Sequence, residues 1–106
     1  MTGHRLVLCN CPPDKAAGIA ETLVTERLAA CVNIVPAVQS IYTWKGQLCR
    51  DTESTLLVKT RASLVPALTR RIVELHPYEV PEVIALELQP GEGEPRYFAW
   101  LDEVTG

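Results

Sequence analysis

The hydrophobic and polar positions of this 106-residue chain predict alternating strands and helices. Strand-like patterns, rich in β-branched, aromatic and alternating apolar residues, span residues 5–11, 30–44, 48–60 and 82–89. Apolar residues recur at helical spacing in residues 16–28 and again in residues 64–75. We expect Asp14 and Ser63 to cap these helices at their N-termini. A short further helix is predicted to begin at Pro95.

The order of these elements is strand, helix, strand, strand, helix, strand, which predicts an α+β, ferredoxin-like sandwich. Right-handed crossovers then place both main helices on one face of a four-stranded antiparallel sheet. The opposite face carries many apolar residues and has no helix to cover it. The length fits one domain over residues 1–106.

Residues 30–44 and 48–60 predict an unusually long hairpin that turns at Lys45-Gly46-Gln47. Each arm is more than twice the usual strand length of about 5 or 6 residues. Pro36 lacks a backbone donor, which predicts a bulge or an edge at that point. The helices of so small a domain cannot cover the distal half, residues 39–50, so we expect self-association to bury its apolar side chains.

Composition limits the classes of partner that the protein can bind and the cellular compartment in which we expect it. The net charge is only −3 and the ten Lys and Arg residues are scattered, so we expect no nucleic-acid partner. No apolar run approaches the ~20 residues of a membrane span, and no secretory signal is recognisable, so we expect a cytoplasmic protein. Reduced thiols are then expected at Cys9, Cys11, Cys31 and Cys49.

Five segments resemble, in order and spacing, the signatures of the CutA divalent-cation tolerance family. They are Ala30-Cys31-Val32-Asn33-Ile34, Ser40-Ile41-Tyr42-Thr43-Trp44-Lys45-Gly46, Lys59-Thr60, His76-Pro77-Tyr78-Glu79-Val80-Pro81-Glu82 and Tyr97-Phe98-Ala99-Trp100. The resemblance covers nearly the whole chain. It implies a ferredoxin-like fold and a tight homotrimer, which would cover the long hairpin and the bare face of the sheet.

The resemblance also implies tolerance to divalent metals, with copper or another divalent cation as ligand. By position, Cys9, His76 and Cys31 match residues implicated in metal binding in this family. Thiolate and imidazole are ligands that copper and zinc favour. The chain departs from some members at Leu75 and Arg71, where they have a histidine and a cysteine. The alternative interpretation is that both cysteines are core residues and that His76 ends a helix.

A pocket between subunits is the second candidate site. Its predicted residues combine polar tips with apolar bodies, and they are Tyr42, Trp44, Glu53, Lys59, Tyr78, Tyr97 and Trp100. Glu53 and Lys59 share one face of a strand, where they could pair or hold a charged ligand. The trimeric design resembles the nitrogen-regulatory signalling proteins, so a signalling protein that binds a small-molecule effector is the alternative function. The aromatic residues could equally be interface anchors.

No catalytic pattern is recognisable in the sequence. It contains no nucleophile elbow, no Gly-rich phosphate loop and no paired-carboxylate motif. We therefore expect a protein that is not an enzyme and that uses no organic cofactor.

Overall fold

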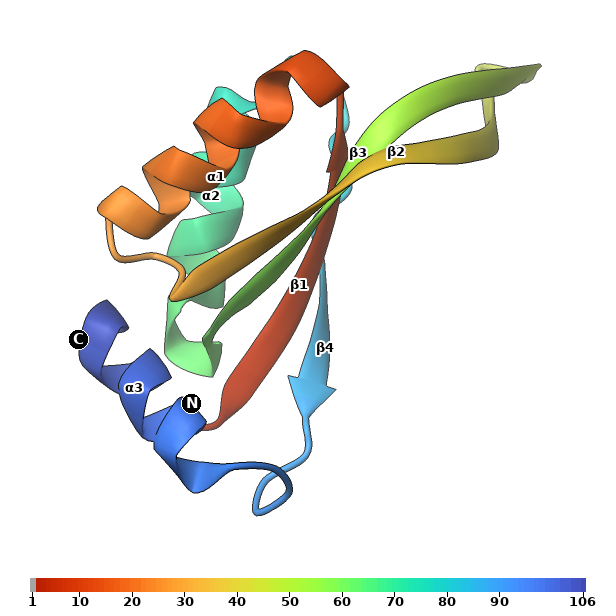
Figure 1. Cartoon of the computed structure of the whole chain (residues 1–106). Helices are drawn as coiled ribbons and strands as arrows, with labels where there is room; N and C mark the ends of the chain where they lie inside the picture. The colour runs from red at the N-terminus through yellow and green to blue at the C-terminus, as the bar shows by residue number, and fades with distance from the viewer. Residues whose placement is uncertain (1) are drawn as a thin grey trace.

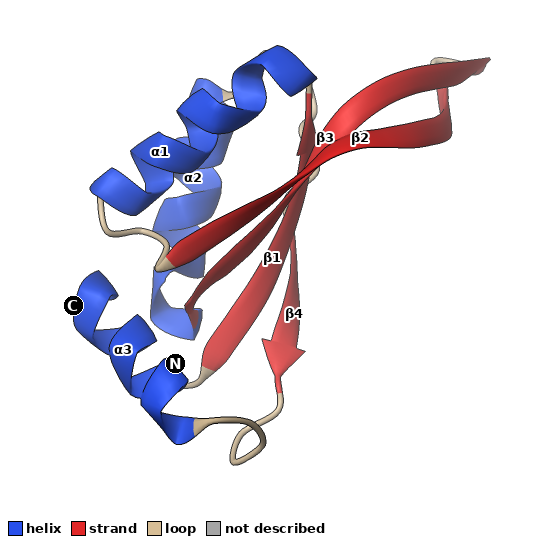
Figure 2. Ribbon diagram, viewed as in Figure 1, coloured by secondary structure: helices blue, strands red, loops and turns tan. Residues whose placement is uncertain are grey.

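The computed structural model describes residues 2–106, which form a four-stranded antiparallel sheet of order β2-β3-β1-β4. The strands are β1 (His4–Cys11), β2 (Cys31–Trp44), β3 (Gln47–Arg61) and β4 (Ile84–Leu88). The helices are α1 (Ala16–Thr25), α2 (Val65–Leu75) and α3 (Pro95–Thr105). Helices α1 and α2 lie on one side of the sheet (Figures 1 and 2). The predicted ferredoxin-like arrangement is confirmed.

The core lies between the sheet and these two helices, because alternate strand positions point toward them. The fully buried apolar residues of this layer are Val7, Cys9, Cys11, Leu23, Leu56, Val58, Leu68 and Ile72. Cys9 and Cys11 therefore act as small hydrophobic residues in β1. Within residues 2–106, no helix is long and apolar enough to cross a membrane.

The two predicted helix caps are wrong. Asp14 and Ser63 each lie inside a short 3₁₀ turn, Pro13–Lys15 and Ala62–Leu64, that precedes the α-helix. The residue before each α-helix, Lys15 or Leu64, makes no side-chain capping bond. Backbone bonds of the turn, such as Lys15 N–H to the Pro12 carbonyl at 2.9 Å, take over the role of the cap.

Helix α1 is shorter than its apolar spacing predicts, since it ends at Thr25 and not at Leu28. Arg27 has a left-handed φ of 61°, which stops the helix. Its guanidinium donates to the carbonyls of Glu103 at 3.1 Å and Gly106 at 3.0 Å. A contact with α3 thus accompanies the end of α1, and the local pattern does not contain that information.

The predicted bulge in the long hairpin is confirmed. The register of β2 against β3 shifts between Val35 and Val38, on either side of Pro36. Ser54 Oγ donates to the Pro36 carbonyl at 2.8 Å, which gives the irregular backbone a hydrogen-bond partner. The bulge bends the hairpin at the point where it leaves the body of the protein (Figure 1).

The hairpin turns at Lys45 and Gly46, where the turn was predicted, and both residues have positive φ, 51° and 78°. This combination matches the twist of the flanking strands in a two-residue turn. The distal hairpin projects beyond the body (Figure 1). The radius of gyration, 14.4 Å, accordingly exceeds the about 13 Å expected for a compact domain of this length.

Helix α3 packs at the end of the sheet where β1 begins and β3 ends. The His4 ring lies 4.8 Å from that of Phe98, and His4 Nε2 lies 2.8 Å from Asp102 Oδ1. Arg61 Nε donates to Thr105 Oγ1 at 2.8 Å. These contacts hold α3 far from the projecting end of the hairpin (Figure 2).

Candidate functional site

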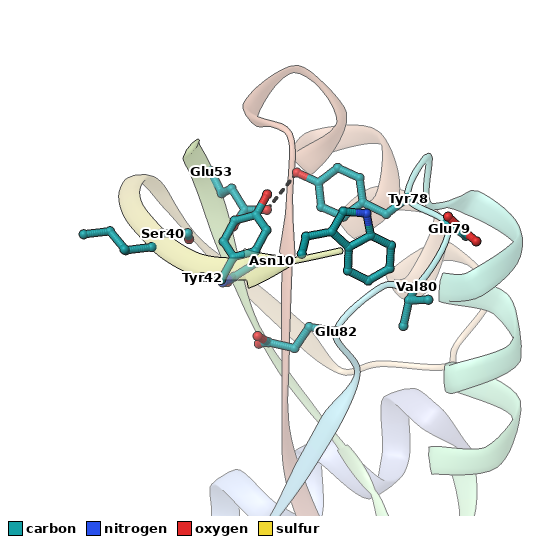
Figure 3. A pocket seen from close by; sticks show the side chains of 10 residues that line it. Asn10, Ser40, Tyr42, Glu53, Tyr78, Glu79, Val80 and Glu82 are labelled. Carbon is teal, nitrogen blue, oxygen red and sulfur yellow. Dashed lines mark hydrogen bonds between the residues drawn. The ribbon is translucent and has the colours of Figure 1, made fainter. Parts of the chain in front are cut away.

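A cavity of about 500 Å³ lies where the distal parts of β2 and β3, the end of β1 and the loop after α2 meet (Figure 3). Its walls combine aromatic, apolar and acidic side chains. They are Asn10, Ser40, Ile41, Tyr42, Trp44, Glu53, Tyr78, Glu79, Val80 and Glu82. Because these residues come from four separate segments, the cavity exists only in the folded chain.

His76 and Pro77 place the loop that forms one wall. A residue before proline disfavours helical backbone, and His76 is extended with ψ at 136°, so α2 ends there. His76 Nε2 lies 2.7 Å from the Asn10 carbonyl oxygen, and Tyr78 N–H donates to His76 Nδ1 at 3.1 Å. Since Nδ1 accepts, Nε2 carries the proton and donates. Both ring nitrogens are therefore engaged in holding the loop on β1.

Glu53 anchors the aromatic side of the cavity. Its side chain is almost completely buried, and its Oε2 accepts a hydrogen bond from Tyr78 Oη at 2.7 Å (Figure 3). Burial, followed by this hydrogen bond, raises the pKa of Tyr78 above its ordinary value. A hydrogen bond to Asp51 raises the pKa of Tyr42 to about 12. Both phenols therefore stay neutral donors at physiological pH.

The charge of the lining is negative. Glu53, Glu79 and Glu82 line the cavity, and no Lys or Arg of residues 2–106 is among the lining residues. An ammonium group at the rim belongs to Lys45, whose Nζ lies 3.7 Å from Glu79 Oε2. The same Nζ lies 5.7 Å from the centre of the Trp44 ring. The cavity thus favours cations and disfavours anions.

The family model for CutA1 divalent ion tolerance protein matches residues 5–104, almost the entire chain. The chain belongs to this family. The resemblance drawn from the sequence motifs is therefore confirmed, and the fold expected from it agrees with the structure.

Relatives from distant organisms support the assignment to the CutA1 family. The divalent-cation tolerance protein CutA of Thermus thermophilus is 50% identical, over 97% of this chain and 99% of its own length. Protein CutA of Mus musculus is 50% identical over 90% of this chain, but the chain spans only 53% of the mouse protein. The chain thus spans about half the length of some relatives and nearly all of others.

Solved structures of family members superpose on the chain. The Thermus thermophilus divalent cation tolerance protein has a TM-score of 0.89 at 49% identity, covering 97% of this chain and 99% of that one. The PII-like protein CutA from Nostoc has a TM-score of 0.91 at 38% identity, covering 96% and 97%. Both structures therefore share the overall fold of this chain.

The predicted pocket residues fall into two groups. Those that line the cavity are Tyr42, Trp44, Glu53 and Tyr78. The others lie toward α3, where Lys59 Nζ is 5.8 Å from the Tyr97 ring and Tyr97 lies 5.5 Å from Trp100. Of the two alternatives for Glu53 and Lys59, a direct pair does not form, because a separation of six positions in a strand corresponds to about 20 Å.

Cys9 and His76 lie beside each other at the end of β1. Cys9 Sγ is 3.8 Å from the Asn10 carbonyl oxygen, which also receives the His76 hydrogen bond. Burial, followed by the nearby Cys11 and acidic residues, raises the pKa of Cys9 to about 12. The thiol is therefore protonated at neutral pH, whereas a metal binds the thiolate. As they stand, Cys9 is a protonated thiol and both ring nitrogens of His76 are engaged in hydrogen bonds.

Cys31, the third predicted ligand, lies apart from them. It pairs with Lys59 at the far end of the β2–β3 ladder, whereas Cys9 pairs with Leu56 on the opposite edge of β3. Within residues 2–106, no group of three or more His, Cys, Asp or Glu side chains has the geometry to hold a metal ion. The predicted trio of ligands does not form a preassembled metal centre.

Sequence reasoning missed four polar residues of the cavity, Asn10, Ser40, Glu79 and Glu82. The two glutamates belong to the motif that begins at His76, so the motif itself contained the signal. Asn10 is a polar residue at the end of an otherwise apolar strand, on the face opposite the core. Its position beside the His76 loop depends on a contact across 66 residues.

Proposed function

We propose that the protein acts in divalent-cation tolerance by binding copper or another divalent cation, without catalysing a reaction. The observation that carries the proposal is the cavity lining, which contains three carboxylates and no basic residue. Membership of the CutA1 divalent ion tolerance family supports the same function. Divalent cations are bound by carboxylate oxygens, and copper also by imidazole and thiolate.

The candidate ligands lie at the same end of the molecule, although those within residues 2–106 do not form a preassembled metal centre. Glu53 and Glu82 line the cavity, and both influence the ionisation of Cys9. We keep Cys9 and His76 as candidate ligands because they share the Asn10 carbonyl next to these carboxylates. Copper binding there requires His76 to give up a hydrogen bond and Cys9 to lose its proton. Metal binding would therefore release protons and strengthen as the pH rises.

The alternative function, signalling through a small anionic effector, is not favoured by the cavity. Carboxylates without a basic partner repel an anion, whereas effectors that carry carboxylate or phosphate groups require donors such as Arg. Lys45, the only cation paired at the rim among residues 2–106, already contacts Glu79.

The proposed assembly is a homotrimer. The sheet face opposite α1 and α2 carries an apolar surface made of Leu6, Leu8, Leu57, Ile84 and Leu86. Ile84 and Leu86 are 53% and 46% exposed in the single chain. Contiguous apolar surface of this kind marks a protein interface. The proposed location is the cytoplasm, which suits the four free cysteines.

Calorimetric titration with Cu²⁺ tests the function. We expect Glu53→Gln and Glu82→Gln to weaken binding by about tenfold or more, since each removes a charged ligand. Cys9→Ser and His76→Ala test the remaining candidate ligands. Glu92→Gln, an exposed glutamate in the loop before α3, is the matched control and should not change the affinity. Equal affinity in wild type and all four ligand variants would remove this site from consideration.

A further inference from the structure

The cavity has features that an inorganic ion does not use. Tyr42, Trp44 and Tyr78 supply aromatic rings to its walls, and Ile41 and Val80 add apolar surface. A metal ion with a shell of about six waters, at about 30 Å³ each, fills less than half of the 500 Å³ volume. Apolar walls with a few polar groups are typical of sites for organic ligands.

Glu53 offers one unused acceptor to this space. Its Oε2 accepts from Tyr78, but no hydrogen bond from residues 2–106 reaches Oε1. No fully buried side-chain oxygen or nitrogen in the same range lacks a partner. Oε1 is therefore open to the cavity, although Glu53 as a whole is only 5% exposed. A carboxylate held in this way favours a ligand that brings a positively charged donor.

The chain already contains one ammonium group that lies near both a carboxylate and an aromatic ring. Lys45 Nζ lies between a carboxylate, Glu79 Oε2 at 3.7 Å, and an aromatic ring, Trp44 at 5.7 Å. Inside the cavity, Glu53 and the ring of Tyr78 repeat this combination of carboxylate and aromatic side chain. Ammonium groups are attracted both by carboxylates and by the faces of aromatic rings.

We propose that the cavity binds a small protonated organic amine. The ammonium group donates to Glu53 Oε1, with Glu82 contributing negative charge, and the carbon part of the ligand packs against Tyr42, Trp44 and Tyr78. This activity goes beyond metal tolerance and does not depend on it. A neutral ligand would leave the carboxylates without a counter-charge, and an acid would be repelled by them.

Benzylammonium and benzyl alcohol are suitable probes, because they share one ring and differ in the charged donor. Both are titrated into the intact protein at pH 7 with EDTA present, and binding is followed by two-dimensional NMR of the backbone amides. We expect benzylammonium to bind at least about tenfold more tightly than benzyl alcohol and to shift the signals of Glu53 and Tyr78. Equal affinities, or no binding of the amine at millimolar concentration, would overturn the proposal.

Variants locate the site. Glu53→Gln keeps an acceptor for Tyr78 and should weaken benzylammonium binding by about tenfold or more. Trp44→Leu should weaken it about threefold or more through the lost ring. The matched controls are Trp100→Leu, whose tryptophan is equally exposed at 41%, and Glu92→Gln. An unchanged affinity in folded Glu53→Gln protein contradicts the assigned site. If this variant fails to fold, the comparison of amine with alcohol in the wild type still decides the question.

Since EDTA removes divalent ions, failure of the copper titration and failure of the amine titration are independent results. Binding of the amine without copper would support the second activity alone. Binding of copper without the amine would leave the metal proposal standing and reject this one.

Discussion

Removing the His76 imidazole would leave two backbone groups without partners, the Asn10 carbonyl and the Tyr78 amide. His76 is only 7% exposed, so water cannot easily replace these bonds. Unpaired buried polar groups cost more than the bond itself is worth. At the scale of single residues, His76 therefore contributes to stability whether or not it also binds a metal.

We expect His76→Ala to lower the free energy of unfolding by about 1–3 kcal/mol. Chemical denaturation followed by circular dichroism measures this change. Glu79→Ala, at an exposed position of the same loop, should stay within about 0.5 kcal/mol of wild type. A loss in His76→Ala no larger than in this control would show that the two hydrogen bonds are unimportant for stability.

The buried thiols should resist modification. Cys9 and Cys11 are fully buried, and burial raises the pKa of Cys9 to about 12, so almost no thiolate exists at pH 8. We expect a thiol reagent to label Cys9 and Cys11 only after unfolding, as mapped by mass spectrometry of peptides. Cys31 and Cys49 are partly exposed and serve as internal references. Rapid labelling of Cys9 in the folded protein would contradict the packing described.

The burial of Cys9 also makes stability depend on pH. The folded-state pKa of about 12 lies above the ordinary value of 9.0, so the unfolded chain ionises first as the pH rises. The stability that the protein gains by keeping this thiol neutral is therefore complete below pH 9. It is lost as the pH rises from about 9 to 12. Denaturation midpoints measured across this range should fall less steeply in Cys9→Ala than in wild type. Parallel curves would contradict this prediction.

At the scale of elements, α2 is amphipathic in the way that its spacing predicts. Leu68 and Ile72 are fully buried against the sheet, whereas Val73 is exposed on the other side. The helix is short, and short helices in proteins depend on packing of one face more than on intrinsic propensity. Its buried stripe should therefore dominate its contribution to stability.

We expect Leu68→Ala to cost about 2–5 kcal/mol of unfolding free energy, because it removes apolar contacts and leaves a cavity. Val73→Ala makes a comparable change on the exposed face and should cost no more than about 0.5 kcal/mol. Urea denaturation of both variants tests the difference. Similar losses at the two positions would mean that the face assigned to the core is wrong.

At the scale of the whole molecule, two apolar surfaces are left uncovered by the part of the chain that the structure describes. The first is the open sheet face, which includes Ile84 and Leu86. The second is the projecting half of the hairpin, where Ile41 and Leu48 are exposed (Figure 1). A molecule that extends over 44 × 25 × 23 Å leaves such an arm in water unless another copy packs against it.

Light scattering after gel filtration tests the proposed homotrimer. We expect a mass of three times the 11.7 kDa of the chain at micromolar concentration. Leu86→Arg places a charge on the open sheet face and should lower this mass, while Glu92→Arg, in an exposed loop, should not. A wild-type monomer would reject the proposed assembly, and a trimer of Leu86→Arg would place the interface elsewhere.

The residues that sequence reasoning placed correctly are those governed by local patterns. The strand alternation, the stripe of α2, the stop at His76-Pro77 and the bulge at Pro36 all depend on near neighbours in the chain. The errors have a different origin. Asp14 and Ser63 failed as caps because a 3₁₀ turn replaced them, and α1 ended early where Arg27 contacts α3.

The sequence by itself determined the order of the elements, the long hairpin and the family, because these follow from periodicity and from ordered motifs. Only the tertiary structure decided which side chains share a cavity. Tyr78 meets Glu53 across 25 residues, while Lys59, in the same strand as Glu53, lies beside Tyr97. Strand register, sheet twist and the loop held by His76 determine which of these side chains are in contact. All three depend on contacts between segments that are distant in the sequence, which no local pattern contains.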